Sequence, residues 1–175
     1  MGIGPPGISI LKEMRQYMRV IQLDSFSELE EKTVGIDRTT WLVEANDKKK
    51  NKHQLSKGDY LVHKCLILKM HKITPLLVFD TLVPLGKDRN KEFWNREIHF
   101  NYVDRAVREC LSRNAIKLIC APYESDAELA YLMEKKYIYA VMTGDSDLMA
   151  YGVSRIIYMI GSQTIVIAIT MNLKK

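Results

Sequence analysis

Two apolar runs that each lead into a pair of acidic residues constrain this chain more than any other feature. They are Leu118–Cys120 and Ala140–Met142, both within the stretch from Ile116 to Leu148. A short apolar run bounded by turn residues is typical of a buried strand, and open α/β sheets bind ligands just past the carboxyl ends of their strands. Four acids lie at those positions: Glu124, Asp126, Asp145 and Asp147. Because clustered carboxylates repel one another unless a cation holds them, the stretch predicts a divalent-metal site.

Two more strand-like runs end in an aspartate. Lys32–Asp37 (KTVGID) and Ile73–Asp80 (ITPLLVFD) place Asp37 and Asp80 at their carboxyl ends. Any single aspartate of this kind is commonly a helix N-cap or a turn residue. Six acids at four strand ends, four of them in acid-x-acid pairs, are harder to explain as independent caps. We therefore interpret them as members of one site.

The rest of the chain alternates between strand-like and helix-like patterns. Ile8–Val20 and Asn101–Asn114 have apolar residues at helical spacing. We also expect helices over the mostly apolar Asp59–His71 and over Asp126–Lys136, which connects two predicted strands. Near the C-terminus Arg155–Ile160 and Thr164–Thr170 are typical of a β-hairpin, and the uncharged Thr164–Met171 should be covered to avoid aggregation. The alternation predicts a single domain of the α/β class, with three αβα layers and a mostly parallel central sheet.

The composition of the chain indicates which kinds of binding partner and which cellular compartment to expect. The formal net charge is +5, and reserving six acids for a metal site leaves a still more basic exterior, which suits a polyanion such as nucleic acid. An ordinary basic soluble protein fits the same charge. The three cysteines lie in apolar surroundings without metal-ligand spacing, so we expect buried thiols in a reducing compartment. Neither a signal peptide nor a membrane-spanning run is visible, so we expect a soluble intracellular protein without membrane contacts.

Carboxylate oxygens are the ligands that Mg²⁺ prefers. Two such ions roughly 3.5–4 Å apart activate a water and stabilise the leaving oxygen of a phosphodiester. Such a site needs nearby cations for the scissile phosphate, and Lys87, Arg89 and Arg96 follow Asp80 closely. An exposed charged helix would explain the same three residues. The lysine-rich run Lys48–Lys52 is either a solvated loop or a phosphate contact.

Several motifs resemble the flap endonuclease / exonuclease 1 / XPG group of structure-specific 5′ nucleases, nearest to its exonuclease 1 branch. They are the MGI start, VGIDRTTWL, HKITPLLVFD, APYESDAELAYL and TGDSDLMAYG. The resemblance implies a PIN-like 5′-nuclease fold in one nuclease-like domain over residues 1–175. Its parts would be an N-terminal nuclease region (1–100), an internal nuclease region (101–160) and a strand-like tail (161–175).

The resemblance also implies an activity. A nuclear DNA repair or replication enzyme would cut DNA at 5′ ends, flaps or nicked and recessed duplexes, with two Mg²⁺ ions or Mn²⁺. Other repair or replication proteins would be its partners. The metal ligands would be the six acids above. Lys87 and Arg96 would contact the scissile phosphate, and Gly2 would lie near the site.

The sequence departs from this family in three places. Gly4-Pro5-Pro6-Gly7 follows the MGI start, where the family enters a helix. The segment between Asp80 and Glu124 is short, so we expect a truncated helical arch over the site. No GCDY-like segment with a seventh carboxylate and no helix-two-turn-helix unit follow the DSDL motif. The alternative to an active nuclease is therefore a catalytically weak or inactive paralogue or fragment that acts as a nucleic-acid-binding scaffold.

Two other enzyme classes share parts of the pattern. VFDTL at Asp80 is similar to a haloacid dehalogenase phosphatase, but Leu82 occupies the position where that chemistry needs a second aspartate. A ribonuclease of the PIN-domain type has the same acidic edge and stays open. Cleavage of matched DNA and RNA would separate it from a DNA nuclease.

Overall fold

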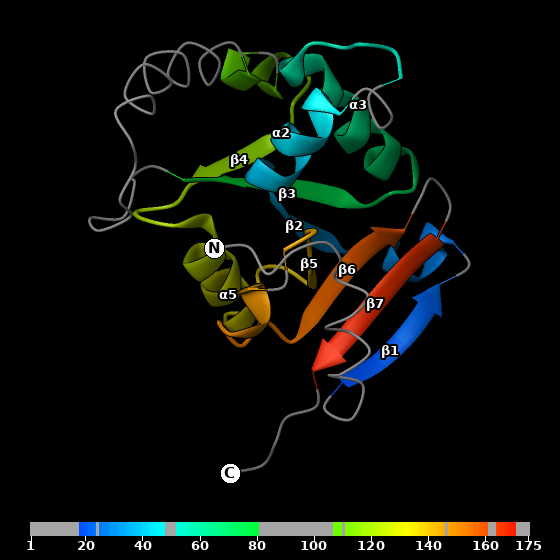
Figure 1. The fold of residues 1–175 in the computed structure, drawn as a ribbon, viewed down its shortest axis with the longest axis vertical. Helices are drawn as coiled ribbons and strands as arrows, with labels where there is room; N and C mark the ends of the chain where they lie inside the picture. The colour runs from blue at the N-terminus through cyan, green and yellow to red at the C-terminus, as the bar shows by residue number, and fades with distance from the viewer. Residues whose placement is uncertain are drawn as a thin grey trace.

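A computed structural model describes residues 18–23, 25–47, 52–80, 107–109, 111–145, 147–160 and 164–170. These residues form a seven-stranded sheet with helices on both faces (Figure 1). The strands are β1 (Met18–Leu23), β2 (Thr33–Asp37), β3 (Thr74–Phe79), β4 (Lys117–Cys120), β5 (Ala140–Met142), β6 (Arg155–Ile160) and β7 (Thr164–Thr170). The helices are α2 (Arg38–Asn46), α3 (Lys57–Met70) and α5 (Ser125–Glu134), with 3₁₀ turns η1 (Phe26–Leu29) and η2 (Asp147–Met149).

The strand order is β1-β7-β6-β5-β2-β3-β4, and neighbours from β6 to β4 pair in parallel. The predicted mostly parallel α/β sheet is confirmed. The chain runs outward from β2 through β3 to β4 and then returns to β5 on the other side of β2. The sheet therefore has a topological switch point between β2 and β5, and such points are where α/β proteins bind their ligands.

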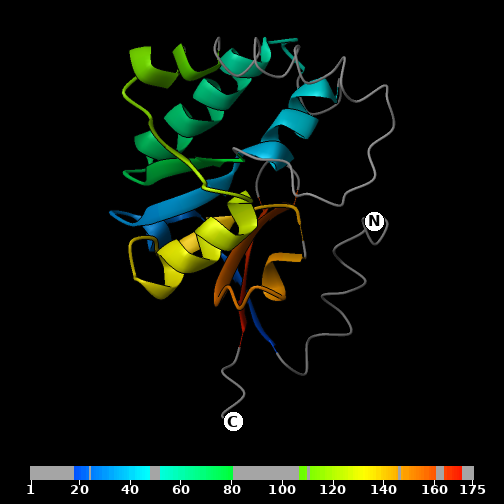
Figure 2. The ribbon, with the colours of Figure 1, turned by 90° about the vertical axis from the view of Figure 1, so that its left-hand side faces the viewer.

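Alternate residues of each central strand contribute to two hydrophobic cores. In β3, Leu77 and Phe79 belong to the core shared with α2 and α3, whereas Leu76 and Val78 belong to the core shared with α5. Figure 2 shows α2 and α3 on one side of these strands and α5 on the other. This period of two, buried on both faces, explains why the strands are continuously apolar and end abruptly in polar residues.

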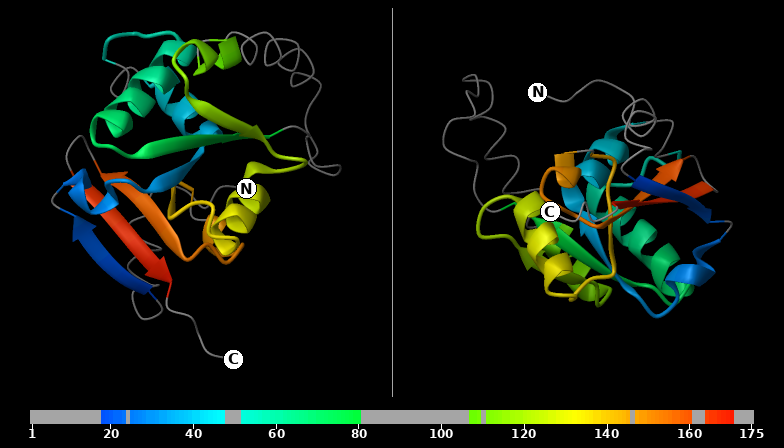
Figure 3. Two further views of the ribbon diagram at one scale, coloured as in Figure 1. Left: turned by 180° about the vertical axis from the view of Figure 1, so that it is seen from behind. Right: turned by 90° about the horizontal axis from the view of Figure 1, so that it is seen from below.

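An antiparallel unit of β6, β7 and β1 completes the sheet, and the strands of this unit lie together in both views of Figure 3. The hairpin strands match the predicted ranges, and β7 is covered along both edges by β6 and β1 as expected. The helix predicted over Ile8–Val20 is wrong at Met18–Val20, which belong to β1, and its remainder lies outside the described residues. Pairing of all six β1 residues with Ile165–Thr170 of β7 overrides the local helical spacing.

The other helices follow the sequence pattern. The predicted ranges around α3 and α5 are confirmed within a few residues. Of the helix predicted over Asn101–Asn114, residues 107–109 and 111–113 are described and helical, with Val107 and Leu111 buried in the core. No described helix has the length and apolarity that a membrane crossing requires.

The cysteine prediction is half right among the described residues. Cys65 is buried on α3, but Cys120 is exposed. The reason is its strand, because β4 is the last strand of the sheet and its residues are incompletely covered. Cys110 lies outside the described residues.

Candidate metal centre

The predicted acids converge at the carboxyl edge of the parallel strands. Asp37 is the last residue of β2, Asp80 follows β3, and Asp145 follows β5. Glu124 and Asp126 lie at the start of α5, which follows β4. Asp147 begins η2 beyond the same edge, but its side chain lies outside the described part of the structure. The switch point between β2 and β5 is thus flanked by Asp37 and Asp145.

Asp37 is buried and accepts three hydrogen bonds, two from the first turn of α2 and one from the residue that follows β5. Its Oδ1 accepts the backbone N–H of Thr39 at 2.9 Å, which makes it the N-cap of α2. Its Oδ2 accepts the hydroxyls of Thr40 at 2.6 Å and Thr143 at 3.2 Å. Burial raises the pKa of Asp37, and Asp80 raises it further, while the bonds from Thr40, Thr39 and Thr143 lower it.

Asp80 joins β3 to the starts of two helices. Its Oδ1 accepts the backbone N–H of Ser125 at 2.7 Å, and its Oδ2 accepts the hydroxyl of Thr39 at 3.1 Å. Glu124 occupies the N-cap position of α5 but makes no side-chain capping bond. Asp80 therefore caps α5 from a different strand and stabilises one of the orphan N–H groups of its first turn.

The strand end after β5 is tied into the same network. The backbone N–H of Asp145 donates to Thr143 Oγ1 at 3.0 Å, and Thr143 lies 3.2 Å from the Thr40 hydroxyl. Across the edge, the Tyr151 hydroxyl donates to Glu124 Oε2 at 3.0 Å. These polar partners were not predicted from sequence. The one available signal was two consecutive hydroxyl residues, Thr39 and Thr40, directly after a strand-end aspartate.

The carboxylates repel one another strongly at Asp126. Burial first, and then the charges of four other acids, together raise the pKa of Asp126 to about 7; the four acids are Asp37, Asp145, Asp80 and Glu124. Five described acids are thus close enough to act on one titration. Nearby, burial and Asp145 raise the pKa of Tyr158 to about 12, and its hydroxyl is buried without a hydrogen-bond partner in the described part of the chain.

The chemistry of this donor set fits a hard divalent cation. All the donors at the edge are oxygens, and mutual repulsion is the energetic problem that a cation solves. Among the described residues no three acid, histidine or cysteine side chains form a closed metal cluster.

Four predicted site residues lie outside the described residues: Gly2, Lys87, Arg89 and Arg96. Of the run Lys48–Lys52, only the exposed Lys52 is described. The structure therefore leaves their roles as predictions.

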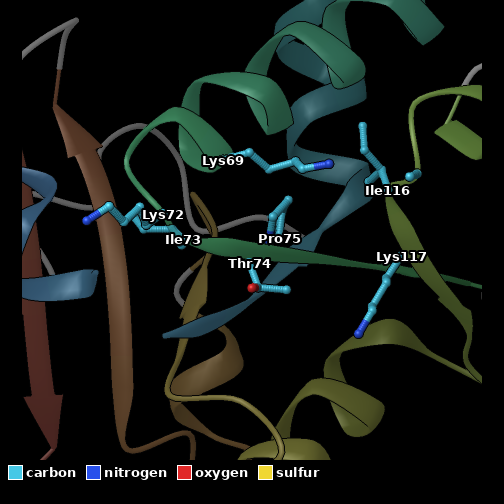
Figure 4. A pocket seen from close by; sticks show the side chains of 8 residues that line it. Lys69, Lys72, Ile73, Thr74, Pro75, Ile116 and Lys117 are labelled. Atoms are coloured by element: carbon cyan, nitrogen blue, oxygen red, sulfur yellow. The ribbon is translucent and has the colours of Figure 1, made fainter. Parts of the chain in front are cut away.

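A separate pocket of about 210 Å³ lies at the opposite, amino edge of the same sheet. It is lined by Thr74 and Pro75 at the start of β3, by Lys117 at the start of β4, and by Lys69 of α3 among others. Figure 4 shows Lys69 extending across the pocket, while Lys72 and Lys117 point away from it. The pocket is thus remote from the acids and lacks convergent polar groups.

The parallel sheet, its switch point and the acidic carboxyl edge define the α/β fold of PIN-like 5′ nucleases. Residues 1–97 match the XPG N-terminal domain, and residues 115–170 match the XPG I-region. The chain therefore belongs to the XPG family of nucleases, as its motifs predicted.

Relatives and solved structures agree with this assignment. The chain is 28% identical to Exonuclease 1 of Oryza sativa subsp. japonica over 85% of its own length, and 26% identical to Exodeoxyribonuclease 1 of Schizosaccharomyces pombe over 86%. It spans only 21% and 31% of those two proteins.

Among solved structures, human GEN1 in complex with Holliday junction DNA shares the fold with a TM-score of 0.74 and 21% identity, covering 93% of this chain and 44% of that one. Flap endonuclease-1 from Methanococcus jannaschii gives a TM-score of 0.61 and 21% identity, covering 88% of this chain and 62% of that one. At these identities the structures show the fold.

Proposed function

We propose that this chain carries the nuclease core of a metal-dependent enzyme that cuts DNA from 5′ ends or at 5′ flaps. The observation that carries the proposal is the set of acids at the switch-point edge, where burial and the charges of four neighbouring acids together raise the pKa of Asp126 to about 7. The repulsion among these acids is unfavourable without a cation. The match to the XPG N-terminal domain and the XPG I-region supports a nuclease site at this edge.

Six carboxylates would hold the cations: Asp37, Asp80, Glu124, Asp126, Asp145 and Asp147. Two bound Mg²⁺ ions, or Mn²⁺ in their place, would supply an activated water and charge neutralisation at the phosphodiester. In the proposal Lys87 and Arg96 contact the scissile phosphate and Gly2 lies near the site, on the strength of the family resemblance. The chain's own described residues orient the acids and exclude water from Asp37.

Relatives support DNA as the substrate. Curated relatives are named Exonuclease 1, and solved structures of similar fold include the catalytic core of Rad2 with DNA substrate and GEN1 with product DNA and Mg²⁺. Nuclear location, a role in repair or replication and contacts with other proteins of those processes belong to the same proposal. The net charge of +5 in spite of the acidic edge is consistent with a polyanionic substrate.

The test is cleavage of 5′-flap and 5′-recessed duplexes by the purified chain in Mg²⁺. We expect 5′ cleavage that EDTA abolishes and that Asp145→Ala reduces by more than about 100-fold, since it removes a cation ligand rather than one of the supporting partners, whose loss costs 10–100-fold. Cleavage that Asp145→Ala leaves unchanged would contradict the proposal. Matched RNA substrates decide between a DNA nuclease and a PIN-type ribonuclease.

A second candidate is a non-catalytic scaffold that binds nucleic acid. The observation that favours it is that no closed metal cluster exists within the described residues. It predicts salt-dependent DNA binding without metal-dependent turnover. Robust cleavage by the wild-type chain that depends on Asp145 would exclude it.

A further inference from the structure

Three threonine hydroxyls link the strand ends at the acidic edge: Thr39, Thr40 and Thr143. Thr39 and Thr40 lie in the first turn of α2, and Thr143 follows β5. We infer that this hydroxyl brace positions Asp37 and Asp80 for cation binding and decides which of their oxygens a cation can reach. The inference rests on the proposed function and deepens it.

A count of lone pairs carries the inference. A carboxylate offers about four acceptor sites, two on each oxygen. In Asp37 three are used: Oδ1 accepts the Thr39 N–H, and Oδ2 accepts both the Thr40 and Thr143 hydroxyls. One site remains, on Oδ1. Asp37 can therefore bind a cation through Oδ1 alone.

Asp80 has more unused acceptor sites than Asp37. Its Oδ1 accepts the Ser125 N–H and its Oδ2 accepts the Thr39 hydroxyl, which leaves one site on each oxygen. Asp80 therefore keeps an acceptor site on each oxygen with which it would hold a cation, whereas Asp37 keeps one on Oδ1 alone. The brace thus assigns unequal roles to two aspartates that look equivalent in the sequence.

The threonine hydroxyls make hydrogen bonds that capping of α2 does not require. A backbone N–H alone satisfies the N-cap bond from Asp37, and it comes from Thr39. The Thr40 hydroxyl adds the shortest bond to Asp37, at 2.6 Å, and the Thr39 hydroxyl reaches across to a residue on another strand. Because the β-branched threonine side chain has few χ1 rotamers, each hydroxyl restricts the orientation of the carboxylate that it contacts.

The brace also connects the two sides of the switch point. Each hydroxyl has one hydrogen, and the short bond to Asp37 takes that of Thr40. Thr143 accepts the Asp145 N–H and donates toward Asp37. A chain of hydrogen bonds therefore runs from the backbone after β5 to the carboxylate that ends β2, so the positions of Asp145 and Asp37 are coupled.

The experiment compares Thr40→Val, which keeps the shape and removes the hydroxyl, with Thr40→Ser, which keeps the hydroxyl. Mn²⁺ affinity of the full chain is measured by titration calorimetry, and thermal unfolding is followed in EDTA. We expect Thr40→Val to weaken Mn²⁺ binding about tenfold or more, and Thr40→Ser to restore affinity to within about threefold of the wild type. Val43→Thr, on an exposed side chain of the same helix, is the matched control and should change neither.

Each outcome decides something. Equal or tighter Mn²⁺ binding by Thr40→Val overturns the inference while leaving the proposed function intact, and so does a loss that Thr40→Ser fails to restore. A wild-type chain that binds no Mn²⁺ overturns the proposed function and the inference together. If Thr40→Val does not fold, Thr39→Val gives the same comparison at Asp80, with Thr39→Ser as its control, because Thr39 is exposed.

Discussion

The two edges of the parallel sheet are built on different principles. At the carboxyl edge, side chains make the structure: Asp37 and Asp80 end or follow their strands and accept hydrogen bonds from the first turns of α2 and α5. At the amino edge, the backbone conformation of the turns shapes the structure. Four residues with left-handed backbone precede the parallel strands β2, β3, β4 and β5: Glu31, Lys72, Ala115 and Lys136.

The difference shows which edge of the sheet carries unfavourable free energy that ligand binding can relieve. At the amino edge each turn connects a helix or a helical turn to the strand that follows it. All four residues have positive φ, yet none of them is a glycine. At the carboxyl edge five acids interact at cost, and their repulsion is relieved only by protonation or by a cation. The backbone strain at the amino edge has no ligand to relieve it, whereas the electrostatic repulsion at the carboxyl edge can be relieved by a bound cation.

The largest expected effect separates two acids of the carboxyl edge. Asp80→Ala and Asp145→Ala should each lower nuclease activity more than about 100-fold, because both remove a proposed cation ligand. Only Asp80→Ala should also lower the free energy of unfolding, by about 1 kcal/mol, since it removes the acceptor for the Ser125 N–H of α5. Cleavage assays and urea unfolding in EDTA check both. Equal stability losses would mean that Asp80 is not the α5 cap.

The next effect concerns pH. The folded-state pKa of Asp126, about 7, lies above the ordinary value, so the folded chain holds this proton more tightly than the unfolded chain. Without metal, the stability contribution is complete at low pH and is lost as pH rises through about 4 to 7. Asp126→Asn should flatten this fall and raise the free energy of unfolding at pH 8 by about 1 kcal/mol, discounted because the side chain is partly exposed.

Urea unfolding in EDTA at several pH values measures the slope. Mg²⁺ should stabilise the wild-type chain at pH 8 and should stabilise Asp126→Asn much less. An unchanged slope in Asp126→Asn would show that another group carries the pH dependence.

Much of the acidic edge could be predicted because it follows from strand ends. Continuous apolar runs locate β2, β3 and β5, and parallel strands necessarily bring their carboxyl ends to one edge. The threonine partners could not be predicted in the same way. Whether Thr143 meets Asp37 depends on β5 pairing with β2, and a strand order with a switch point is a long-range property that no local pattern encodes.

The same reason explains the missed strand. The spacing of Ile8–Val20 fits a helix locally, but Met18–Leu23 pairs along β7, a partner far away in the sequence. The exposure of Cys120 likewise depends on β4 being the end of the sheet. Local patterns predicted the elements, and the errors arose where a distant strand decides the outcome.

A smaller effect is expected at the amino edge. Ala115 has φ of 51°, in the left-handed region that glycine adopts without steric strain. Ala115→Gly should raise the free energy of unfolding by about 0.5–1 kcal/mol, because relief of strain exceeds the added entropy of the unfolded chain. Nuclease activity should stay unchanged, since the residue lies at the edge away from the acids. Urea unfolding of the two chains measures the gain, and a loss of stability would contradict it.

The smallest effect is expected at Lys72, which has φ of 57° and forms an exposed ion pair with Glu30. Lys72→Gly relieves the same backbone strain as Ala115→Gly but removes this pair, so the two changes oppose each other. The gain should be smaller than for Ala115→Gly at low salt and should approach it in high salt, where the pair is screened. Unfolding at two salt concentrations, with Glu30→Gln as the matched control, measures it. A Lys72→Gly gain that ignores salt would show that the ion pair contributes nothing and that backbone geometry alone governs the amino edge.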